Sequence, residues 1–268
     1  MRKRCLICLA AFVFLAALVP GLWAQSQSNL MISPPPVPWF EFVKGQKDLR
    51  LGGTYVSITG DESSSGANDE IDFTGVGLGL MGRYAFNDYL ALDMGFNYIY
   101  VGGEVGKTSV DVWLWSIPAD LELQLVNKDR VGIILFGGVN KTWSVVDVEG
   151  TSATVNLFGP QGGLEVAFKF TDFVVTPFFM IQKMSGTVEV NSKSYTISSF
   201  TTKAYGLDVV YKPWNLTLSG IFQQAATQSN QDYDTVLISL NYDFRWGGAE
   251  EGAREAPKPK PEPVKPAL

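Results

Sequence analysis

The chain has 268 residues, of which 21 are Lys or Arg, 27 are Asp or Glu, two are Cys and none is His, so its net charge is −6. Without histidine a single chain cannot build a Ser-His-Asp or Cys-His catalytic site, and it cannot ligate a metal through imidazole. The composition therefore predicts a protein that is not an enzyme and that has no cofactor, no metal site and no catalytic residues.

Residues 1–24 have the pattern of a secretory signal peptide. Met1–Arg4 is basic, Cys5–Val19 is apolar, and Leu22-Trp23-Ala24 is a suitable cleavage site. Removing these 24 residues takes away three basic side chains, which leaves 18 against 27 acidic ones and a net charge of −9. It also removes both cysteines, so the mature chain is predicted to have neither thiolate chemistry nor disulfides.

Apolar residues alternate with polar or small ones along most of the mature chain, which is typical of strands with two different faces. Between residues 90 and 97, for example, large apolar side chains at even positions alternate with small or polar ones at odd positions. Ten such runs predict ten strands, at residues 48–60, 71–86, 89–102, 109–126, 131–146, 154–170, 173–189, 197–212, 215–227 and 234–246.

The links between these runs alternate in length. Links after the even-numbered runs are short and turn-like, such as Asn87-Asp88 and Thr171-Asp172. Links after the odd-numbered runs are mostly longer and more polar, such as Asp61–Glu70, Asp147–Ala153 and Ser229–Asp232. This pattern predicts an all-β fold, a transmembrane antiparallel up-and-down β-barrel of ten strands with eight as the alternative, whose short turns and both termini are periplasmic.

Two features favour a barrel in lipid over a soluble barrel. The run from Leu90 to Tyr100, at about 3.3 Å per residue and a tilt of roughly 40°, rises about 25 Å, which is the height of an apolar band in a membrane. Aromatic residues also cluster at both ends of the strands, as membrane interfaces favour. The long-loop ends carry Tyr98, Tyr100, Trp113, Trp115 and Trp143, and the short-turn ends carry Tyr84, Phe86, Phe168, Phe170, Tyr211, Phe244 and Trp246.

The signal peptide, the aromatic-ended hairpins and the last run, Ser239–Trp246 (SLNYDFRW), resemble the bacterial outer-membrane β-barrel superfamily of small porin-like, opacity-type surface proteins. The resemblance covers residues 48–246 and implies that Tyr242, Phe244 and Trp246 are the signal read by the outer-membrane assembly machinery. The chain departs from the family by continuing 22 residues beyond Trp246 and by lacking a glycine in that signal. The resemblance implies a Gram-negative cell envelope, with outer-membrane lipid and lipopolysaccharide as partners and no nucleic acid.

The segments on either side of the barrel differ from it in composition. Residues 25–47 contain Pro34–Pro38 (PPPVP), and five prolines in the last twelve residues predict an extended polyproline-type tail. Two interpretations of the tail stay open: a periplasmic tether to an envelope partner, and a solvated end without a partner. The predicted domains are a signal peptide (1–24), a Pro-rich N-terminal periplasmic segment (25–47), the transmembrane barrel (48–246) and a disordered Pro/Lys/Glu-rich periplasmic tail (247–268).

The polar positions of the alternation predict which side chains line the lumen. Among them, Asp120 and Glu122 stand two residues apart on one face, so they could act as an acid and a base if their environments differed. The alternative is an interior network in which Arg, Lys and carboxylates pair and fill the barrel. The predicted lumen-lining residues are Arg50, Arg83, Asp93, Asn97, Asp120, Glu122, Glu165, Lys169, Asp208, Asp243 and Arg245, with Gln124, Asn140 and Asn241 beside them.

Prolines interrupt two of the predicted strands. Pro118 and Pro177 each remove a ladder donor, which predicts a bulge or kink at both positions. The run 173–189, which contains Pro177, alternates poorly around Phe178–Ile181 and is the least regular of the ten.

The long-loop ends form an acidic rim without basic residues. Its carboxylates could favour cation entry or bind divalent cations, or they could be an ordinary solvated surface. The rim residues are Asp61, Glu62, Asp69, Glu70, Asp147, Glu149, Asp232 and Asp234.

A barrel of ten strands is only slightly wider than one of eight, whose interior is filled by side chains. A wide general porin is therefore not expected. The sequence predicts an outer-membrane β-barrel protein with a structural or surface role, with or without a narrow channel. Two alternatives stay open: a small cation-selective pore, favoured by the acidic rim, and a tether that reaches an envelope partner through the periplasmic tail.

Overall fold

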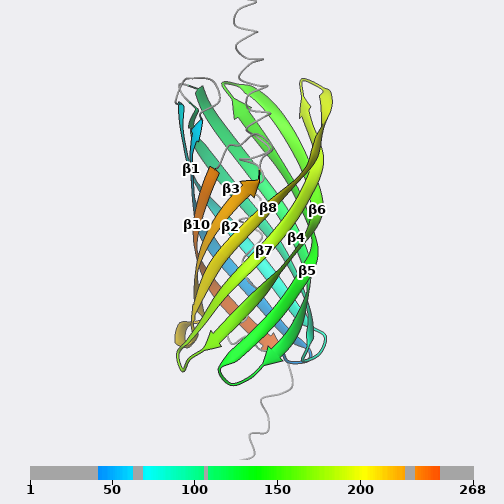
Figure 1. The fold of residues 1–268 in the computed structure, drawn as a ribbon, viewed down its shortest axis with the longest axis vertical. Coiled ribbons are helices and arrows are strands. Elements are labelled where there is room, and N and C mark those ends of the chain that lie inside the picture. Colours follow the sequence, from blue (N-terminus) through cyan, green and yellow to red (C-terminus); the bar gives the residue numbers. More distant parts are fainter. Residues whose placement is uncertain (1–41, 63–68, 106–107, 227–232, 248–268) are drawn as a thin grey trace, which may run out of the picture.

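The computed structural model describes residues 42–62, 69–105, 108–226 and 233–247, which form one closed antiparallel barrel (Figure 1). Each strand pairs with its neighbours in sequence, and β10 pairs with β1 to close the barrel. The predicted all-β, up-and-down barrel is confirmed, with ten strands rather than eight. They are β1 (Gln46–Glu62), β2 (Asp69–Ala85), β3 (Leu90–Val105), β4 (Thr108–Asn127), β5 (Val131–Val148), β6 (Thr151–Lys169), β7 (Phe173–Val190), β8 (Lys193–Tyr211), β9 (Leu216–Ala226) and β10 (Tyr233–Gly247).

Several predicted features lie outside the described residues. They are the signal peptide, the Pro-rich segment up to residue 41, the tail from residue 248, and Asp232 of the acidic rim. The side chains of five further rim residues are not described either: Asp61, Glu62, Asp69, Glu70 and Asp234. Within the described ranges, no helix is long and apolar enough to cross a membrane.

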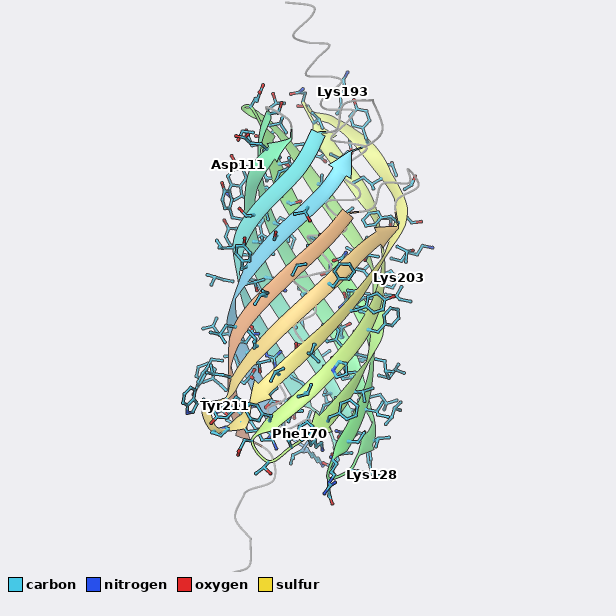
Figure 2. All side chains as sticks on the ribbon, turned by 60° about the vertical axis from the view of Figure 1, so that its left-hand side comes forward. Asp111, Lys128, Phe170, Lys193, Lys203 and Tyr211 are labelled. Atoms are coloured by element: carbon cyan, nitrogen blue, oxygen red, sulfur yellow. The ribbon has the colours of Figure 1, made fainter. Side chains whose placement is uncertain are left out.

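The four short connections predicted after the even-numbered strands lie together at one end of the barrel, which we call the turn side. In the β2–β3 connection, Asn87 Oδ1 accepts hydrogen bonds from the backbone N–H groups of Tyr89 (2.8 Å) and Leu90 (2.9 Å), as in an Asx-turn. A 3-10 turn, η1 (Lys212–Trp214), makes the β8–β9 corner. The opposite end is the loop side; Figure 2 shows Tyr211 and Phe170 at the turn side and Asp111 and Lys193 at the loop side.

Two connections on the loop side are tight turns, so the expectation of long loops there is wrong. Strand β5 continues to Val148 and β6 begins at Thr151, where the loop Asp147–Ala153 was expected. Only Glu149 (φ 49°) and Gly150 (φ 81°) turn the chain, and Asn191 (φ 47°) with Ser192 (φ 64°) does the same between β7 and β8. Two successive residues with positive φ match the twist of a β-hairpin, which allows the strands to run into the turn. The residues looked like a loop because their outward side chains are polar.

The expected bulges at the two prolines are also absent from the register. Met94 pairs with Ala119 and Asn97 with Ser116, so the β3–β4 register is unchanged across Pro118. Pro177 pairs in register with Leu207 of β8. The register shifts lie elsewhere, between Gln124 and Val126 and between Met184 and Gly186. Proline is accommodated here by omitting ladder bonds rather than by inserting a residue. The irregular run 173–189 is strand β7, with one of these shifts near its loop-side end.

The outer face of the barrel changes character halfway along its height. In the turn-side half, outward side chains are apolar and well exposed, among them Leu78 (64%), Leu121 (53%), Leu135 (47%) and Leu240 (58%). An apolar outer surface of this kind is typical of a barrel wall in lipid. In the loop-side half, apolar residues are still exposed near the middle of the barrel, such as Phe158 and Val236, and Tyr195 is exposed near a hairpin tip. The other exposed outward residues there are mainly polar: Thr59, Thr74, Glu104, Ser109, Ser152, Thr154, Ser185 and Glu189.

The interior changes in the opposite sense, and it has three layers. A turn-side layer of small apolar residues surrounds Phe42, and it comprises Phe42, Ala85, Ala91, Ile134, Ala167, Val174 and Val210. Next to it, toward the loop side, lies a belt of buried charged residues that includes Arg50 and Arg83. A larger loop-side layer is mainly apolar, although buried Thr142, Ser144 and Thr235 lie at the same level. Its apolar cluster draws on all ten strands: Val56, Ile58, Phe73, Ile99, Val101, Val110, Leu114, Val146, Val155, Leu157, Phe178, Met180, Met184, Ala204, Ile221 and Leu237.

Candidate functional site

The charged belt is the largest concentration of ionisable side chains described inside the barrel. Alternation turns its members inward, and strand register brings them side by side: Arg83 stands opposite both Asp48 and Asp93, and Asp93 stands opposite Asp120. Most members lie three to five residues from the turn-side end of their strands, so the belt is inside the half with the apolar outer face. It comprises Asp48, Arg50, Arg83, Asp93, Asp120, Glu122, Glu165, Asp208, Asp243 and Arg245.

Arg50 is the centre of one group of contacts. Its Nε donates to Asp243 Oδ1 at 2.7 Å, and its Nη1 lies 3.7 Å from Asp208 Oδ2. Thr217 accepts a hydrogen bond from Arg50 Nη2 at 3.4 Å and donates to Asp243 Oδ2 at 2.6 Å. Arg50 is on β1 whereas Asp208 is on β8, so this guanidinium joins strands that are not neighbours in the wall.

Arg83 is the centre of a second group. It forms a buried ion pair with Asp48, in which Nε lies 3.0 Å from Oδ2, and its Nη1 lies 3.7 Å from Glu122 Oε2. Arg245 Nε approaches the other Asp48 oxygen at 3.4 Å. The ring of Phe42 lies 4.8 Å from the Arg83 guanidinium carbon, which is cation–π distance. Phe42, just before β1, therefore packs against the belt from the turn side.

Carboxylates outnumber guanidinium groups in the belt. It holds seven Asp and Glu side chains against three Arg, an excess of four. Among the described residues, Asp93 Oδ1, Asp120 Oδ1 and Glu165 Oε2 are buried without a hydrogen-bond partner. Because an isolated carboxylate is costly to remove from water, this composition favours cations over anions in the lumen.

The belt also reaches across the lumen. Arg50 on β1 lies 3.7 Å from Asp208 on β8, and Arg83 on β2 lies 3.7 Å from Glu122 on β4, so both guanidinium groups reach strands that are not their neighbours in the wall. With Arg50 and Arg83 only 1% and 2% exposed, the two guanidinium groups are enclosed by other atoms rather than facing a wide aqueous passage.

The predicted lumen residues fall into three situations. Nine are buried in the interior: Arg50, Arg83, Asp93, Asn97, Asp120, Glu122, Glu165, Asp208 and Asp243. Arg245 is partly exposed at the turn-side mouth, where its Nη2 donates to Gln46 Oε1 at 2.6 Å. Lys169 lies half-buried at the turn side and donates to Asn127 Oδ1 at 2.6 Å, away from the belt.

Asp120 and Glu122 share a face but not a partner. Gln161 Nε2 donates to Asp120 Oδ2 at 2.6 Å, whereas Glu122 lies beside Arg83. The two carboxyl groups therefore take part in separate contacts. Asn97 lies outside the belt and donates weakly to Ser116 Oγ at 3.4 Å.

Sequence reasoning missed Asp48, Phe42 and Thr217. Asp48 could have been found, because it stands two residues before Arg50 in the same alternation and so faces the same side. Phe42 precedes the first strand and Thr217 is a small polar residue, and neither carries a pattern that distinguishes it. The three predicted assembly-signal aromatics, Tyr242, Phe244 and Trp246, lie on the outward face of β10 with 43%, 45% and 49% exposed surface.

The chain is similar to several solved structures. Three solved structures illustrate the similarity. The outer membrane protease OmpT from Escherichia coli is 10% identical, with a TM-score of 0.49 over 74% of this chain and 96% of that one. An outer membrane channel from Pseudomonas putida F1 is 9% identical, with a TM-score of 0.45 over 76% and 98%. OprG from Pseudomonas aeruginosa is 14% identical, with a TM-score of 0.38 over 76% and 97%.

No curated protein matches the sequence. The outer membrane protein beta-barrel domain, in contrast, matches it over residues 14–244, which is most of the chain. The resemblance drawn from the aromatic-ended hairpins is thereby confirmed at the level of the family. The protein belongs to the outer membrane protein beta-barrel domain family, and its place is the bacterial outer membrane.

Proposed function

We propose that the protein is an outer-membrane barrel with a structural and surface role, and that its loop-side half stands in water at the cell surface. The observation that carries the proposal is the reversal of polarity along the barrel. In the loop-side half, exposed residues such as Thr154 and Ser185 face outward while Leu157 and Leu114 are buried inside. A wall in lipid requires the opposite arrangement, so this half is suited to water on its outside.

The orientation follows from the connections. Short turns of outer-membrane barrels face the periplasm, so the turn side, where Gln46 and Gly247 pair, is proposed to be periplasmic. The strands that extend beyond the apolar band then project outward. In the hairpin of β7 and β8, both faces of residues Lys193–Thr196 are exposed, which suits a segment that stands in water.

A wide channel does not suit this interior. The belt places Arg50 and Arg83 across the lumen, and apolar layers lie on both sides of it. The chain also has no histidine, and both of its cysteines lie in the predicted signal peptide. The proposed role is therefore structural and not enzymatic.

Site-directed labelling tests the proposal directly. With Cys5 and Cys8 as the only native cysteines, single cysteines can be introduced as Thr154→Cys on the loop side and Leu135→Cys on the apolar band. A membrane-impermeant maleimide added to intact cells is expected to label Thr154→Cys and to leave Leu135→Cys unlabelled. Labelling of Thr154→Cys only after the outer membrane is opened would reverse the orientation and contradict the proposal.

A small cation-selective pore is the second candidate, favoured by the carboxylate excess of the belt. Such a pore predicts stepwise, cation-selective currents from the refolded protein in planar bilayers. These currents would fall in Asp93→Asn and Glu122→Gln and persist in Asp111→Asn, which changes an outward carboxylate on the loop side. A bilayer that stays silent would remove the pore and leave the structural role.

A further inference from the structure

Three lysines are exposed on the outward face of one side of the barrel, between β5 and β8. Lys141 is on β5, Lys183 on β7 and Lys203 on β8, each at an exposed position of the alternation. On the turn-side flank of each lysine the outward residues are mainly apolar. On the loop-side flank they become polar beyond Lys183 and Lys203, whereas Lys141 is followed by Trp143 and Val145. On β7, for example, Ile181 lies on the turn-side flank of Lys183 and Ser185 on its loop-side flank. The lysines therefore mark the border of the apolar band.

Their height along the barrel can be derived from the strands. Lys141 and Lys183 each stand ten residues from the turn-side end of their strand, at Val131 and Phe173, and Lys203 stands eight residues from Tyr211. At about 3.3 Å per residue and a tilt of roughly 40°, this is about 20 to 25 Å, the height of the apolar band. Figure 2 shows Lys203 midway between Tyr211 and Lys193, which agrees with this position. The ammonium groups thus lie at the level of lipid headgroups.

The register places the three close together. Lys183 pairs with Thr201 and Lys203 with Ile181, so Lys183 and Lys203 are diagonal neighbours with Cα atoms about 7 to 8 Å apart. Lys141 pairs with Phe158, which pairs with Ser185, two residues from Lys183. Two strand spacings and two residues along the strand give roughly 12 Å between Lys141 and Lys183. A single headgroup with more than one anionic group can span these distances.

The three lysines are available to an external anion. Among the residues that the structure describes, Lys141, Lys183 and Lys203 make no ion pair. The described acidic residues on the same outward faces stand well away: Asp147 and Glu189 are each six residues further along β5 and β7. The opposite wall carries no described lysine at this height, since β1 presents Tyr55 and Ser57 there. Among the described outward residues at this height, the positive charge is therefore on one side of the barrel.

Aromatic side chains flank the lysines on the same level. Trp143, two residues beyond Lys141, stacks on Trp115 with ring centroids 6.4 Å apart and an interplanar angle of 10°. Tyr98 lies 5.7 Å from the other side of Trp115. Such rings prefer the membrane interface, which supports the assignment of this height to headgroups by a second, independent observation.

We propose that Lys141, Lys183 and Lys203 bind the phosphate groups of an anionic lipid in the leaflet on the loop side. A charge on the lipid face is tolerated only near the interface, and there a long lysine stem extends along the apolar surface while its ammonium reaches the headgroups. Lysine attracts phosphate as a point charge, and each lysine near an anionic membrane surface contributes about 1 kcal/mol. The proposal rests on the position of the barrel in the bilayer that was proposed above, but not on which side faces the cell exterior.

Lipid binding in nanodiscs of phosphatidylcholine tests this site, with lipid A, which carries two phosphates, as the probe. The triple variant Lys141→Ser/Lys183→Ser/Lys203→Ser is compared with the wild type and with Lys128→Ser/Lys193→Ser, a control that removes lysines at the turn-side and loop-side ends. Because each lysine contributes about 1 kcal/mol, loss of all three is expected to lower the affinity for lipid A about a hundredfold. The control is expected to bind as the wild type does.

The outcomes decide whether the three lysines bind lipid A, and whether they recognise the lipid or a free anion. Equal binding of lipid A by the triple variant and the wild type would overturn the proposal. Competition by free inorganic phosphate at the concentration of lipid A would also overturn it, because the site would then bind a soluble anion. An unchanged heat-modifiable gel migration of the triple variant shows that it is folded. Maleimide labelling in cells measures the orientation of the barrel, and lipid binding in nanodiscs measures the lysine site. Failure of the proposed orientation can therefore be distinguished from failure of the proposed lipid site.

Discussion

The two halves of the barrel use the same alternation of residues for opposite purposes. In the turn-side half, Leu135 faces outward and Arg50 faces inward, whereas in the loop-side half Thr154 faces outward and Leu157 faces inward. The strands pass from one arrangement to the other without a break, since β5 and β6 stay paired from Val131 opposite Phe168 to Val148 opposite Thr151. Backbone hydrogen bonding is therefore independent of which face is apolar.

The comparison teaches what each half relies on for stability. A polar interior in lipid must satisfy its charges among themselves, so the turn-side half depends on the ion pairs of the belt. An apolar interior surrounded by water is held by the hydrophobic effect, so the loop-side half depends on packing as a soluble protein does. Substitutions chosen in matched pairs from the two halves can break or sharpen this distinction.

The largest effect is expected from Arg50→Ala. Removing this guanidinium leaves Asp243 and Asp208 buried without their counter-charge, and breaking a buried ion pair costs about 3 to 5 kcal/mol. Urea unfolding in lipid vesicles, followed by tryptophan fluorescence, measures the loss. Arg245→Gln serves as the control, because the Arg245 side chain is 24% exposed and solvent replaces part of its contact. A loss below about 1 kcal/mol for Arg50→Ala would show that the belt is hydrated rather than dry.

Leu157→Ala tests the loop-side layer. Leu157 is 1% exposed in the interior, so its truncation is expected to leave a cavity and cost about 2 to 5 kcal/mol. Leu121→Ala makes the same change on the outward face of the turn-side half, where Leu121 is 53% exposed. Acyl chains are as apolar as leucine and replace the lost contacts, so this variant is expected to lose about 1 kcal/mol or less. Equal losses for the two variants would argue against a packed loop-side interior.

Leu135→Arg and Thr154→Arg add the same charge to the outward faces of the two halves. Leu135 lies four residues from Val131, near the middle of the apolar band, where an arginine costs about 2 to 4 kcal/mol. Thr154 is exposed on the loop side, where the change is expected to stay within about 0.5 kcal/mol. The difference in unfolding free energy between the variants in vesicles measures the membrane position. If Thr154→Arg were the more damaging change, the bilayer would have to cover the loop side instead.

The strand number could be predicted because alternation and turn residues are local properties of the sequence. The face that each run turns inward could not be predicted everywhere, because alternation is symmetric between two faces. In the belt, charged residues such as Arg50 indicate the inner face, but around Leu157 the apolar face is the inner one. The polar stretch Asp147–Ala153 was interpreted as a loop for the same reason, although it is the tip of a hairpin.

The site was predictable in its members but not in its pairing. Inward projection found Arg50, Arg83 and most of their carboxylate partners, because each occupies the buried position of a strand. The contact between Arg50 and Asp208 joins β1 to β8. A sequence pattern within one strand holds no information about contacts across a lumen, since these depend on the diameter and closure of the barrel.

The smallest expected effect concerns the backbone at the tip of the β5–β6 hairpin. Gly150 has φ of 81°, and a Cβ added there would meet no atom within 4 Å, so Gly150→Ala introduces backbone strain without a steric clash. Forcing an L-residue into this conformation costs about 1 kcal/mol. Gly220→Ala on β9 is the matched control, because a Cβ there is also unobstructed and its φ is not positive. Equilibrium unfolding in vesicles is expected to separate the two by about 1 kcal/mol, with Gly220→Ala near the wild type. If the residues around Gly150 formed the long loop that their polarity suggested, both substitutions would be neutral. A measured difference between Gly150→Ala and Gly220→Ala therefore distinguishes a tight hairpin that continues the barrel wall from a long loop between two strands.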